Sequence, residues 1–420
     1  MGEVRGKGFG FWTLTFLVVA NMIGAGVFTT SGYTLASLGD PALVMWAWLV
    51  AGLIALCGAF SYGLLIKRIP VSGGEYAFLS ASGFPFVGFV AGWVSLLAGF
   101  SGAIAYAALA FGEHLPGEFP GKWPAVGLVV LGALAHGAKR VIGAVTQNTA
   151  VALKLALLLT ILGFGWWSMN SRDWLGDASG QAVEGPLILV FAQALVWISL
   201  SYSGFNAAVY LAGEAKAPLV VAKSLVVGTS LVTVLYLSLN GLFVFAPPAE
   251  VVSGRADVAA LAAGWIGGVD FEGFVRLVIS LALVTSVLSM MMAGPRVYGK
   301  MAEDGLLPKA FVVRADRVWP AVLLQMAVTL LLIAFGSLQD LLGYLGLILS
   351  LCAAASVLCL FAEGNRSSLK GWKVLPPLVF VGATTLSAGL LTIRDPWQAM
   401  GTVVTFAAGA VGFYFSKKSR

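Results

Sequence analysis

Apolar runs recur along almost the whole chain, and many reach the roughly 20 residues that a helix needs to cross the hydrocarbon core of a membrane. Of the 420 residues, 59% are hydrophobic and only 10% are charged, whereas soluble domains carry about 25% charged residues. Backbone groups inside lipid must be hydrogen-bonded within their own segment, which favours helices. The pattern therefore predicts an all-α membrane protein with twelve transmembrane helices, near residues 10–36, 42–66, 85–111, 123–138, 143–168, 186–213, 222–246, 271–295, 319–336, 341–361, 374–392 and 398–416.

Basic residues are distributed unevenly over the segments between these spans. If both ends of the chain lie inside, five basic residues fall outside, Lys154 falls within a span, and the other 19 of the 25 lie on the inner side. Lysine and arginine concentrate on the cytoplasmic side of membranes. We therefore predict a multi-pass protein of the cell (inner) membrane, in contact with lipid, with both termini in the cytoplasm. The five outer residues are Lys122, Arg172, Arg255, Arg276 and Arg394.

The composition also limits the partners of the chain. We interpret the net charge of +6 as the inner–outer asymmetry and not as a nucleic-acid surface. Cys57, Cys352 and Cys359 fall inside predicted spans, as small packing residues do. No CxxC motif or Cys/His cluster is present, so neither a metal nor a cofactor is expected. The first apolar run lacks a small-residue cleavage site, and we interpret it as a span and not as a signal peptide.

Two of the predicted spans are interrupted near mid-depth by glycine and small polar residues. The first interruption lies at residues 21–26 and the second at residues 199–206, in the sixth span. Non-helical backbone is tolerated at that depth only where it lines a cavity or is buried in protein. Close packing of neighbouring helices is the alternative explanation for such glycines.

The two interruptions are five spans apart. A unit with an odd number of spans, when repeated, enters the membrane from the opposite side, as in inverted-repeat transporters with a midplane site between two discontinuous helices. At such a break, a helix N-terminus offers N–H groups to a carboxylate and a C-terminus offers carbonyls to an ammonium or sodium ion. An α-amino acid presents one group of each kind, so the pattern indicates an amino acid substrate.

Ordered motifs along the chain resemble those of the amino acid–polyamine–organocation transporters. Asn21–Phe28 is similar to the first-helix signature G-x-x-I-G-x-G-I-F, Pro70–Tyr76 to the loop after the second helix, and Tyr202–Pro218 to the sixth helix and the loop that follows. Arg296 with Met301–Pro308 resembles the run that ends the eighth helix. These matches cover nearly the whole chain.

The resemblance implies a fold and a binding site. The fold is a LeuT-type five-plus-five inverted repeat in residues 1–362, with helices 1 and 6 unwound at mid-membrane and helices 11 and 12 in residues 363–420. Backbone N–H groups of the first break would hold the substrate carboxylate, and carbonyls at both breaks its amino group. The N–H groups are those near Gly24, Ala25 and Gly26, and the carbonyls those near Met22, Ile23 and Tyr202.

Other residues of the sixth span are candidates for the side-chain pocket. We expect Ser203 and Asn206 to face that pocket, with hydrogen bonding between helices as the alternative. Phe205 and Trp197 are candidates to gate the cavity, with ordinary packing as the alternative.

Lys154 is the one basic residue near mid-depth. It follows Arg140 by 14 residues and precedes Arg172 by 18, which places it roughly 16–20 Å from the inner face at 1.5 Å per residue. Ionisable residues at that depth are costly and usually functional. We expect no Asp or Glu inside the predicted spans, so the partners of Lys154 are expected to be hydroxyls and carbonyls.

The resemblance implies a specific role for this lysine. In sodium-coupled relatives an ion links the first helix to the eighth, and in relatives with a fifth-helix lysine the ammonium takes that place. Lys154 fits this description, and Thr285 and Ser286 are the hydroxyls of the eighth span best placed to meet it. Hydroxyls in membrane helices also commonly bond their own preceding turn, which is the alternative for both.

Together these features predict a secondary transporter of small neutral L-amino acids that works by alternating access. It would be sodium-independent, coupled to protons or working by exchange. No fixed negative charge is expected in the substrate path, which argues against cationic substrates and polyamines. The alternatives are a transport-fold sensor or accessory subunit, and an intramembrane enzyme in which Lys154 activates a serine.

Overall fold

The structure is a computed structural model that describes residues 8–115, 121–137, 144–169, 185–303, 305, 307–313, 318–362 and 369–418. Within these ranges, the side chains of residues 136, 137, 144–151, 169, 293, 296, 300 and 416–418 are not described. Arg140 and Arg172, and positions 304 and 306 of the run that ends the eighth span, lie outside the described residues.

The described residues form helices and contain no β-strand. The α-helices are α1 (Phe11–Met22), α2 (Gly26–Leu38), α3 (Pro41–Arg68), α4 (Gly74–Ala81), α5 (Pro85–Val94), α6 (Ala103–His114), α7 (Trp123–Gly137), α8 (Ala144–Met169), α9 (Leu187–Tyr202), α10 (Pro218–Phe245), α11 (Ala249–Val252), α12 (Val258–Glu303), α13 (Trp319–Phe335), α14 (Leu338–Leu358), α15 (Leu375–Arg394) and α16 (Pro396–Lys418). The other helical segments are the π-helix η1 (Ser95–Gly102) and the 3-10 helices η2 (Ala207–Glu214), η3 (Lys309–Phe311), η4 (Cys359–Phe361) and η6 (Gly371–Val374).

Local sequence explains where several helices begin. At the start of α3 the Asp40 side chain accepts a hydrogen bond from the Ala42 amide at 2.6 Å, and Pro41 occupies the first helical position. A carboxylate cap satisfies an otherwise unpaired N–H, and proline at this position has no N–H to satisfy. Ser337 and Asp340 form a capping box at the start of α14.

Glycine explains one large interruption. The long helix α12 contains Gly268 with φ 77° and ψ −171°, which is not helical. Glycine has no Cβ and adopts positive φ at little cost. The residues before Gly268 therefore form a separate outer segment, and the predicted eighth span at 271–295 lies beyond the kink.

Eight of the described helical stretches are long and apolar enough to cross a membrane. The pair α1 and α2 passes the same test if it is counted as one span bent by 44°, and three shorter helices are also apolar, in α7, α8 and α13. The prediction of an all-helical chain with several spanning helices is confirmed. The fifth predicted span, 143–168, agrees closely with α8 (Ala144–Met169).

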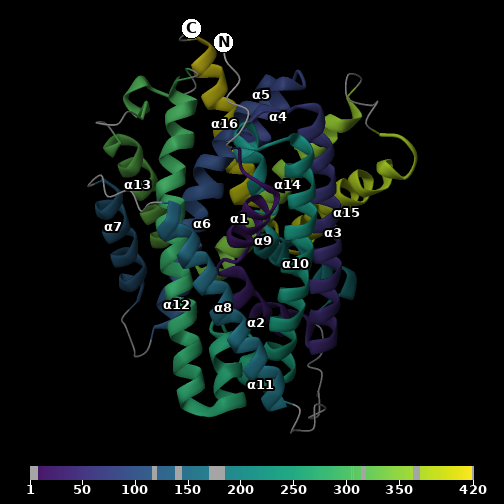
Figure 1. The fold of residues 1–420 in the computed structure, drawn as a ribbon, viewed down its shortest axis with the longest axis vertical. Helices are drawn as coiled ribbons and strands as arrows, with labels where there is room; N and C mark the ends of the chain where they lie inside the picture. Colours follow the sequence, from purple (N-terminus) through teal and green to yellow (C-terminus); the bar gives the residue numbers. More distant parts are fainter. Residues whose placement is uncertain are drawn as a thin grey trace.

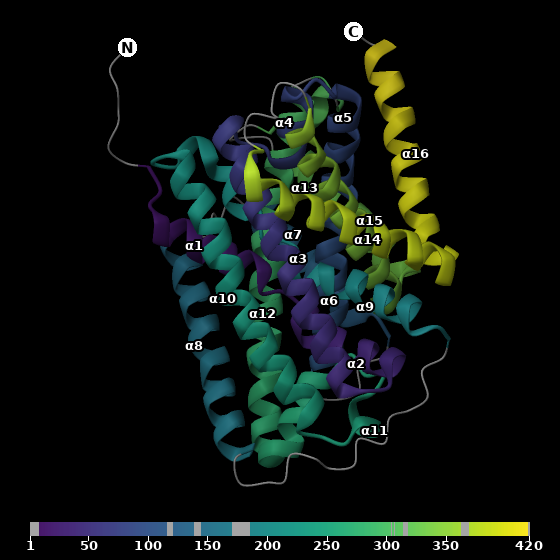
Figure 2. The same ribbon diagram turned by 90° about the vertical axis from the view of Figure 1, so that its right-hand side faces the viewer.

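The helices form one bundle in which segments far apart in sequence pack side by side (Figures 1 and 2). Helix α10 packs against both α3 and α1, and α12 packs against α6. The two ends of the chain lie at the same end of the bundle, and α11 lies at the opposite end (Figure 1). Helix α16 runs along one edge (Figure 2).

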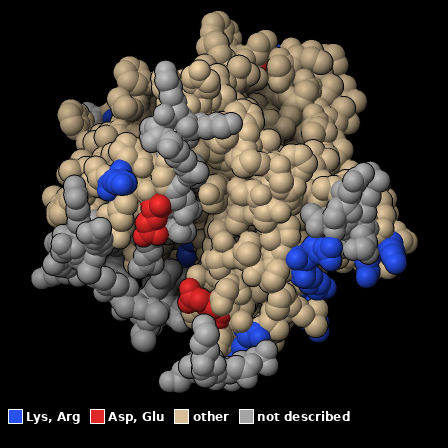
Figure 3. All heavy atoms as spheres, turned by 90° about the horizontal axis from the view of Figure 1, so that it is seen from above, with Lys and Arg blue, Asp and Glu red and all other residues tan. Residues whose placement is uncertain are grey.

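Figure 3 shows the end of the bundle that carries both termini. On the part of this surface that the structure describes, patches of lysine and arginine are larger than patches of aspartate and glutamate. We call this the inner end, and the end near α11 the outer end.

Candidate functional site

The first break separates α1 from α2. Helix α1 ends at Met22 and α2 begins at Gly26, so Ile23, Gly24 and Ala25 lie between them, where we expected an interruption. The first N–H groups of a helix have no partner within it, and its N-terminus carries partial positive charge. The start of α2 therefore offers unpaired N–H groups at the point where α1 ends in carbonyls.

The second break follows α9. Helix α9 ends at Tyr202, and the chain resumes as the 3-10 helix η2 at Ala207. Between them Gly204 has φ 97°, a backbone conformation that only glycine adopts readily. The amide of Ala207 donates to the Gly204 carbonyl at 2.9 Å, which closes a tight turn.

The two breaks are in contact. A Cβ atom at Gly204 would lie 2.9 Å from the Asn21 carbonyl oxygen, and one at Gly26 would lie 3.0 Å from Ser201 Cα. The Thr30 and Ser201 hydroxyls are hydrogen-bonded at 3.3 Å. Glycine at both breaks thus allows the two backbones to approach each other closely.

Tyr236 of α10 joins both helix ends, although nothing in the sequence analysis singled it out. Its hydroxyl lies 2.5 Å from the Met22 carbonyl oxygen and 2.9 Å from the Ser201 carbonyl oxygen. It is fully buried, with its ring edge-on to Trp48 and Tyr202 at 5.5 and 5.2 Å between centroids. A hydroxyl has one proton, so Tyr236 donates to one of these two carbonyls at a time.

Lys154 of α8 reaches the end of α1. Its side chain is 8% exposed, its ammonium donates to the Ile23 carbonyl, and Ser286 Oγ lies 3.5 Å from Nζ. The structure therefore brings Lys154 between the first break and α12, as the sequence analysis expected. A cation at a helix C-terminus is also favoured by the partial negative charge there.

The two hydroxyls expected to meet Lys154 differ. Both donate to the Ala282 carbonyl of their own helix, Thr285 at 2.8 Å and Ser286 at 2.9 Å. Of these two hydroxyls, only that of Ser286 is among the described contacts of Lys154. For Thr285 the structure shows the alternative given above, a hydrogen bond to its own preceding turn.

The candidates of the sixth span divide in a similar way. We expected Asn206 to face the side-chain pocket, with hydrogen bonding between helices as the alternative. In the structure its amide group donates to Glu75 Oε1 of α4. Phe205 is 7% exposed and packs edge-on against Tyr62 at 5.3 Å and Phe380 at 6.0 Å between ring centroids. Ser203 is half-buried in the turn. Trp197 is buried and donates to Gln398 Oε1 of α16 at 3.1 Å, which is a packing role.

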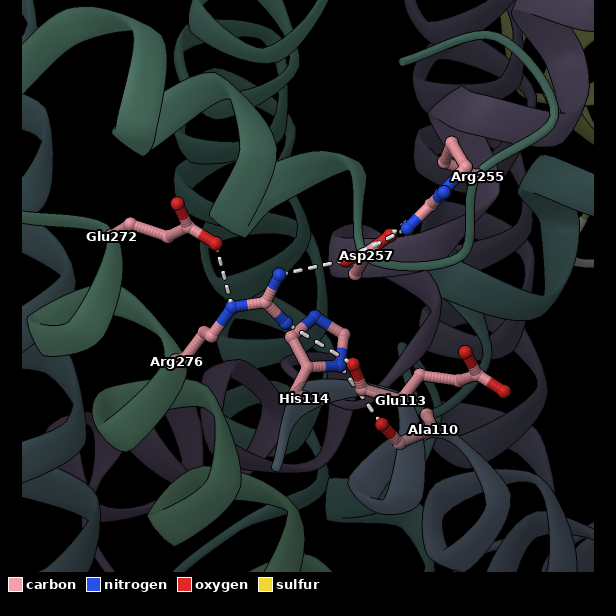
Figure 4. Close-up of polar contacts among 7 residues, drawn as sticks. All are labelled: Ala110, Glu113, His114, Arg255, Asp257, Glu272 and Arg276. Atoms are coloured by element: carbon pink, nitrogen blue, oxygen red, sulfur yellow. Dashed lines mark hydrogen bonds and ion pairs between the residues drawn. The ribbon is translucent and has the colours of Figure 1, made fainter. Parts of the chain in front are cut away.

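A polar cluster at the outer end surrounds Arg276 of α12 (Figure 4). The guanidinium lies 2.8 Å from Asp257 and 2.9 Å from Glu272, and it donates to the Glu113 carbonyl at 3.2 Å. Burial alone would raise the pKa of Asp257, but hydrogen bonds from Arg276 and Arg255 hold it below its ordinary value. This cluster lies on the wall of a cavity of about 1150 Å³ that also contacts Tyr33 of α2 and Lys122, which directly precedes α7.

Comparison with known proteins places these features in context. A family model described as amino acid permease matches residues 9–393. The serine/threonine exchanger SteT of Bacillus subtilis is 25% identical, over 96% of this chain and 95% of its own length. The human large neutral amino acids transporter small subunit 2 is 25% identical over 83% of this chain and 68% of its own length. The mouse b(0,+)-type amino acid transporter 1 is 24% identical, over 95% and 85% respectively.

Proposed function

Because the chain belongs to the amino acid permease family, we propose that it is a secondary transporter of small neutral L-amino acids that works by alternating access. The family and the relatives are transporters and not enzymes, and the multi-pass membrane character follows from them together with the spanning helices. The observation that carries the proposal is the contact between the two helix breaks, with the N-terminus of α2 facing it.

The proposed fold is a LeuT-type inverted repeat with twelve spans. Eight long helices, the bent pair α1–α2 and the three shorter apolar helices correspond in order to the twelve runs in the sequence. The breaks fall in the first and sixth of these. This supports a five-plus-five core in residues 1–362, with the last two spans in residues 363–420.

The proposed orientation places the inner end in the cytoplasm. Both termini lie at that end, and its described surface is mainly basic where it is charged (Figure 3). Such a surface agrees with the positive-inside rule. The outer cavity and the cluster around Arg276 would then face the outside of the cell membrane.

The proposed substrate site uses the two helix ends differently. The carboxylate would bind the N–H groups of Gly24, Ala25 and Gly26, at the start of α2. The amino group would bind the carbonyls at the end of α1 and at Tyr202. Two of these carbonyls, those of Met22 and Ile23, already accept from Tyr236 and Lys154, but a carbonyl oxygen has two lone pairs and can accept a second hydrogen bond.

Several observations support a small neutral substrate. Ser201 lies directly against Gly26, which narrows the space beside the break. Glu75, the acidic side chain bonded to Asn206 beside the second break, already accepts hydrogen bonds from three protein donors, so its oxygens are engaged within the protein. One relative is named as a serine/threonine exchanger.

Lys154 supports sodium-independent transport. Its ammonium occupies the position between the α1 carbonyl end and Ser286 at which a bridging cation would sit. Transport would then be driven by protons or by exchange against another amino acid. A sensor or accessory subunit would bind amino acids at the same place without moving them.

One experiment tests the proposal. The purified chain is screened by thermal shift against the twenty amino acids with and without sodium, and reconstituted for uptake of those that stabilise it. We expect stabilisation by small neutral amino acids and uptake that does not need sodium. Binding without uptake would identify a sensor, and stabilisation by cationic or large amino acids alone would refute the specificity.

A further inference from the structure

Glu75 is a buried carboxylate outside the substrate site described above. It lies in the first turn of α4, at the inner end, and is 7% exposed. Burying an ionised carboxylate is costly unless hydrogen bonds replace its water. Glu75 Oε1 accepts from the Tyr62 hydroxyl at 2.8 Å and from the Asn206 amide, and Oε2 accepts from the Tyr210 hydroxyl at 2.8 Å.

These three donors come from two different parts of the bundle. Tyr62 belongs to α3, whereas Asn206 precedes η2 and Tyr210 lies within it. Glu75 therefore ties the segment after the second break to α3. None of its three donors is a cation, so the geometry depends on the carboxylate itself.

The loop before Glu75 reinforces this contact. Gly74 has φ 61°, and a Cβ atom there would lie 2.8 Å from Tyr210 Cζ. The Ser72 hydroxyl accepts from the Gly213 amide at 2.9 Å. Residues 72–75 thus hold η2 near its start and near its end.

The segment held by Glu75 is also linked to α1. The amide of Phe9 donates to the Glu214 carbonyl at 2.8 Å, and the amide of Lys216 donates to the Phe9 carbonyl at 3.1 Å. Because of this bridge, α1 and η2 are joined at the inner end as well as at the breaks. A movement of η2 away from α3 and α4 would therefore break the contacts of Glu75 and displace the start of α1 or break this bridge.

We propose that Glu75 is a positioning residue of the inner gate, which holds α1 and η2 closed beneath the substrate site through Asn206 and Tyr210. The proposal rests on the proposed transport function, since a gate has meaning only for a transporter. It assigns Asn206 to the gate in the closed state, and explains why this side chain is not directed at the substrate.

The test uses Glu75→Gln in the full-length protein. Glutamine has the same shape but only one acceptor oxygen, and its amide group faces donors. Loss of one or two hydrogen bonds to a charged group shifts the closed–open equilibrium by about tenfold or more. Glu250→Gln is the matched control, because Glu250 is exposed in α11 at the outer end.

Two readouts follow the gate. A cysteine in place of Ala208, which is fully buried in η2, is labelled from the inner side with a membrane-impermeant maleimide, and its rate is compared with that of the protein without this cysteine. We expect about tenfold faster labelling in Glu75→Gln and no change in Glu250→Gln. We also expect the KM measured from the outer side to rise, because fewer molecules face outward.

Unchanged labelling in Glu75→Gln would overturn the proposal. Should that variant fail to fold, Tyr210→Phe decides, since it removes one donor and keeps the ring against Gly74; it should also label faster, by a smaller factor. Labelling needs no substrate, so it tests Glu75 independently. Absence of amino acid uptake by the unaltered protein would instead refute the proposed function.

Discussion

Lys154→Met is the substitution that most directly tests the proposed site. Methionine keeps an unbranched apolar side chain and removes the ammonium. The Ile23 carbonyl then loses its donor, whereas Ser286 keeps its hydrogen bond to Ala282 at 2.9 Å. One buried acceptor is left unpaired, which costs about 1–3 kcal/mol.

The substitution changes the free energy of unfolding in two opposite directions: the unpaired Ile23 carbonyl lowers it, and removal of the buried charge raises it. Burial of an ammonium costs several kcal/mol in solvation, and the substitution removes that cost. We therefore expect the thermal stability of the protein to stay the same or to rise. Transport should fall by about 5–150-fold, the factor that corresponds to 1–3 kcal/mol of lost coupling between α1 and α8.

The assay is uptake into proteoliposomes, measured with a pH gradient and separately by exchange against internal amino acid. Loss of both activities would place Lys154 in the transport cycle itself, and loss of pH-driven accumulation alone would identify it as the coupling residue. Ser286→Ala is the control, expected to change transport by about threefold or less, because its oxygen lies 3.5 Å from Nζ and a weak neutral hydrogen bond contributes little. Full activity of Lys154→Met in both modes, or sodium-stimulated uptake by the unaltered protein, would refute the reasoning.

Three further predictions concern other parts of the molecule. Gly24→Ala should abolish amino acid binding in thermal shift, because the new methyl group would block the approach of the carboxylate to the N–H groups. The protein should stay monodisperse, because the nearest protein atom to the new Cβ is 3.9 Å away. Gly382→Ala, with open space around it, is the control, and normal binding by Gly24→Ala would remove the carboxylate site. Gly26→Ala is not equivalent, since Ser201 occupies that space. Because the pKa of Asp257 is lowered in the folded protein, its ion pair with Arg276 stabilises the fold above about pH 4, and this stabilisation is lost as the pH falls through the folded-state pKa. The difference in Tm between the unaltered protein and Asp257→Asn should therefore shrink from pH 7 to pH 3. A constant difference would contradict the prediction. A cysteine at Glu250 should label from outside intact cells and one at Lys309 should not, both positions being exposed; the reverse pattern would overturn the orientation.

The parts of the site that could be predicted are those encoded in a short stretch of chain. The breaks after Met22 and Tyr202 were predictable because glycine occurs there together with small polar residues, a combination that weakens a helix locally. The depth of Lys154 follows from its distance along an apolar run, and the lack of carboxylates at that depth left carbonyls and hydroxyls as partners. Its contact with Ile23 agrees with this reasoning.

Sequence reasoning could not assign partners across the bundle. Nothing local distinguishes Tyr236 from the other nine tyrosines, yet its hydroxyl meets carbonyls of two broken helices. Asn206 was assigned to the substrate pocket by its position beside the break, and the structure gives it to Glu75. The expectation that the spans contain no acidic residue was wrong for Glu272, which lies in the predicted eighth span and pairs with Arg276, and it overlooked the buried carboxylate of Glu75 in α4.

The sequence by itself determined the class of the protein, its spans and the positions of its helix breaks, because hydropathy and glycine content act on each segment separately. Tertiary structure alone decided which donor meets which acceptor. Glu75 and Asn206 are 131 residues apart, and Met22 and Tyr236 are 214 apart. Such pairs form only when packing brings distant helices together, and a buried polar group is satisfied by whatever partner that packing supplies.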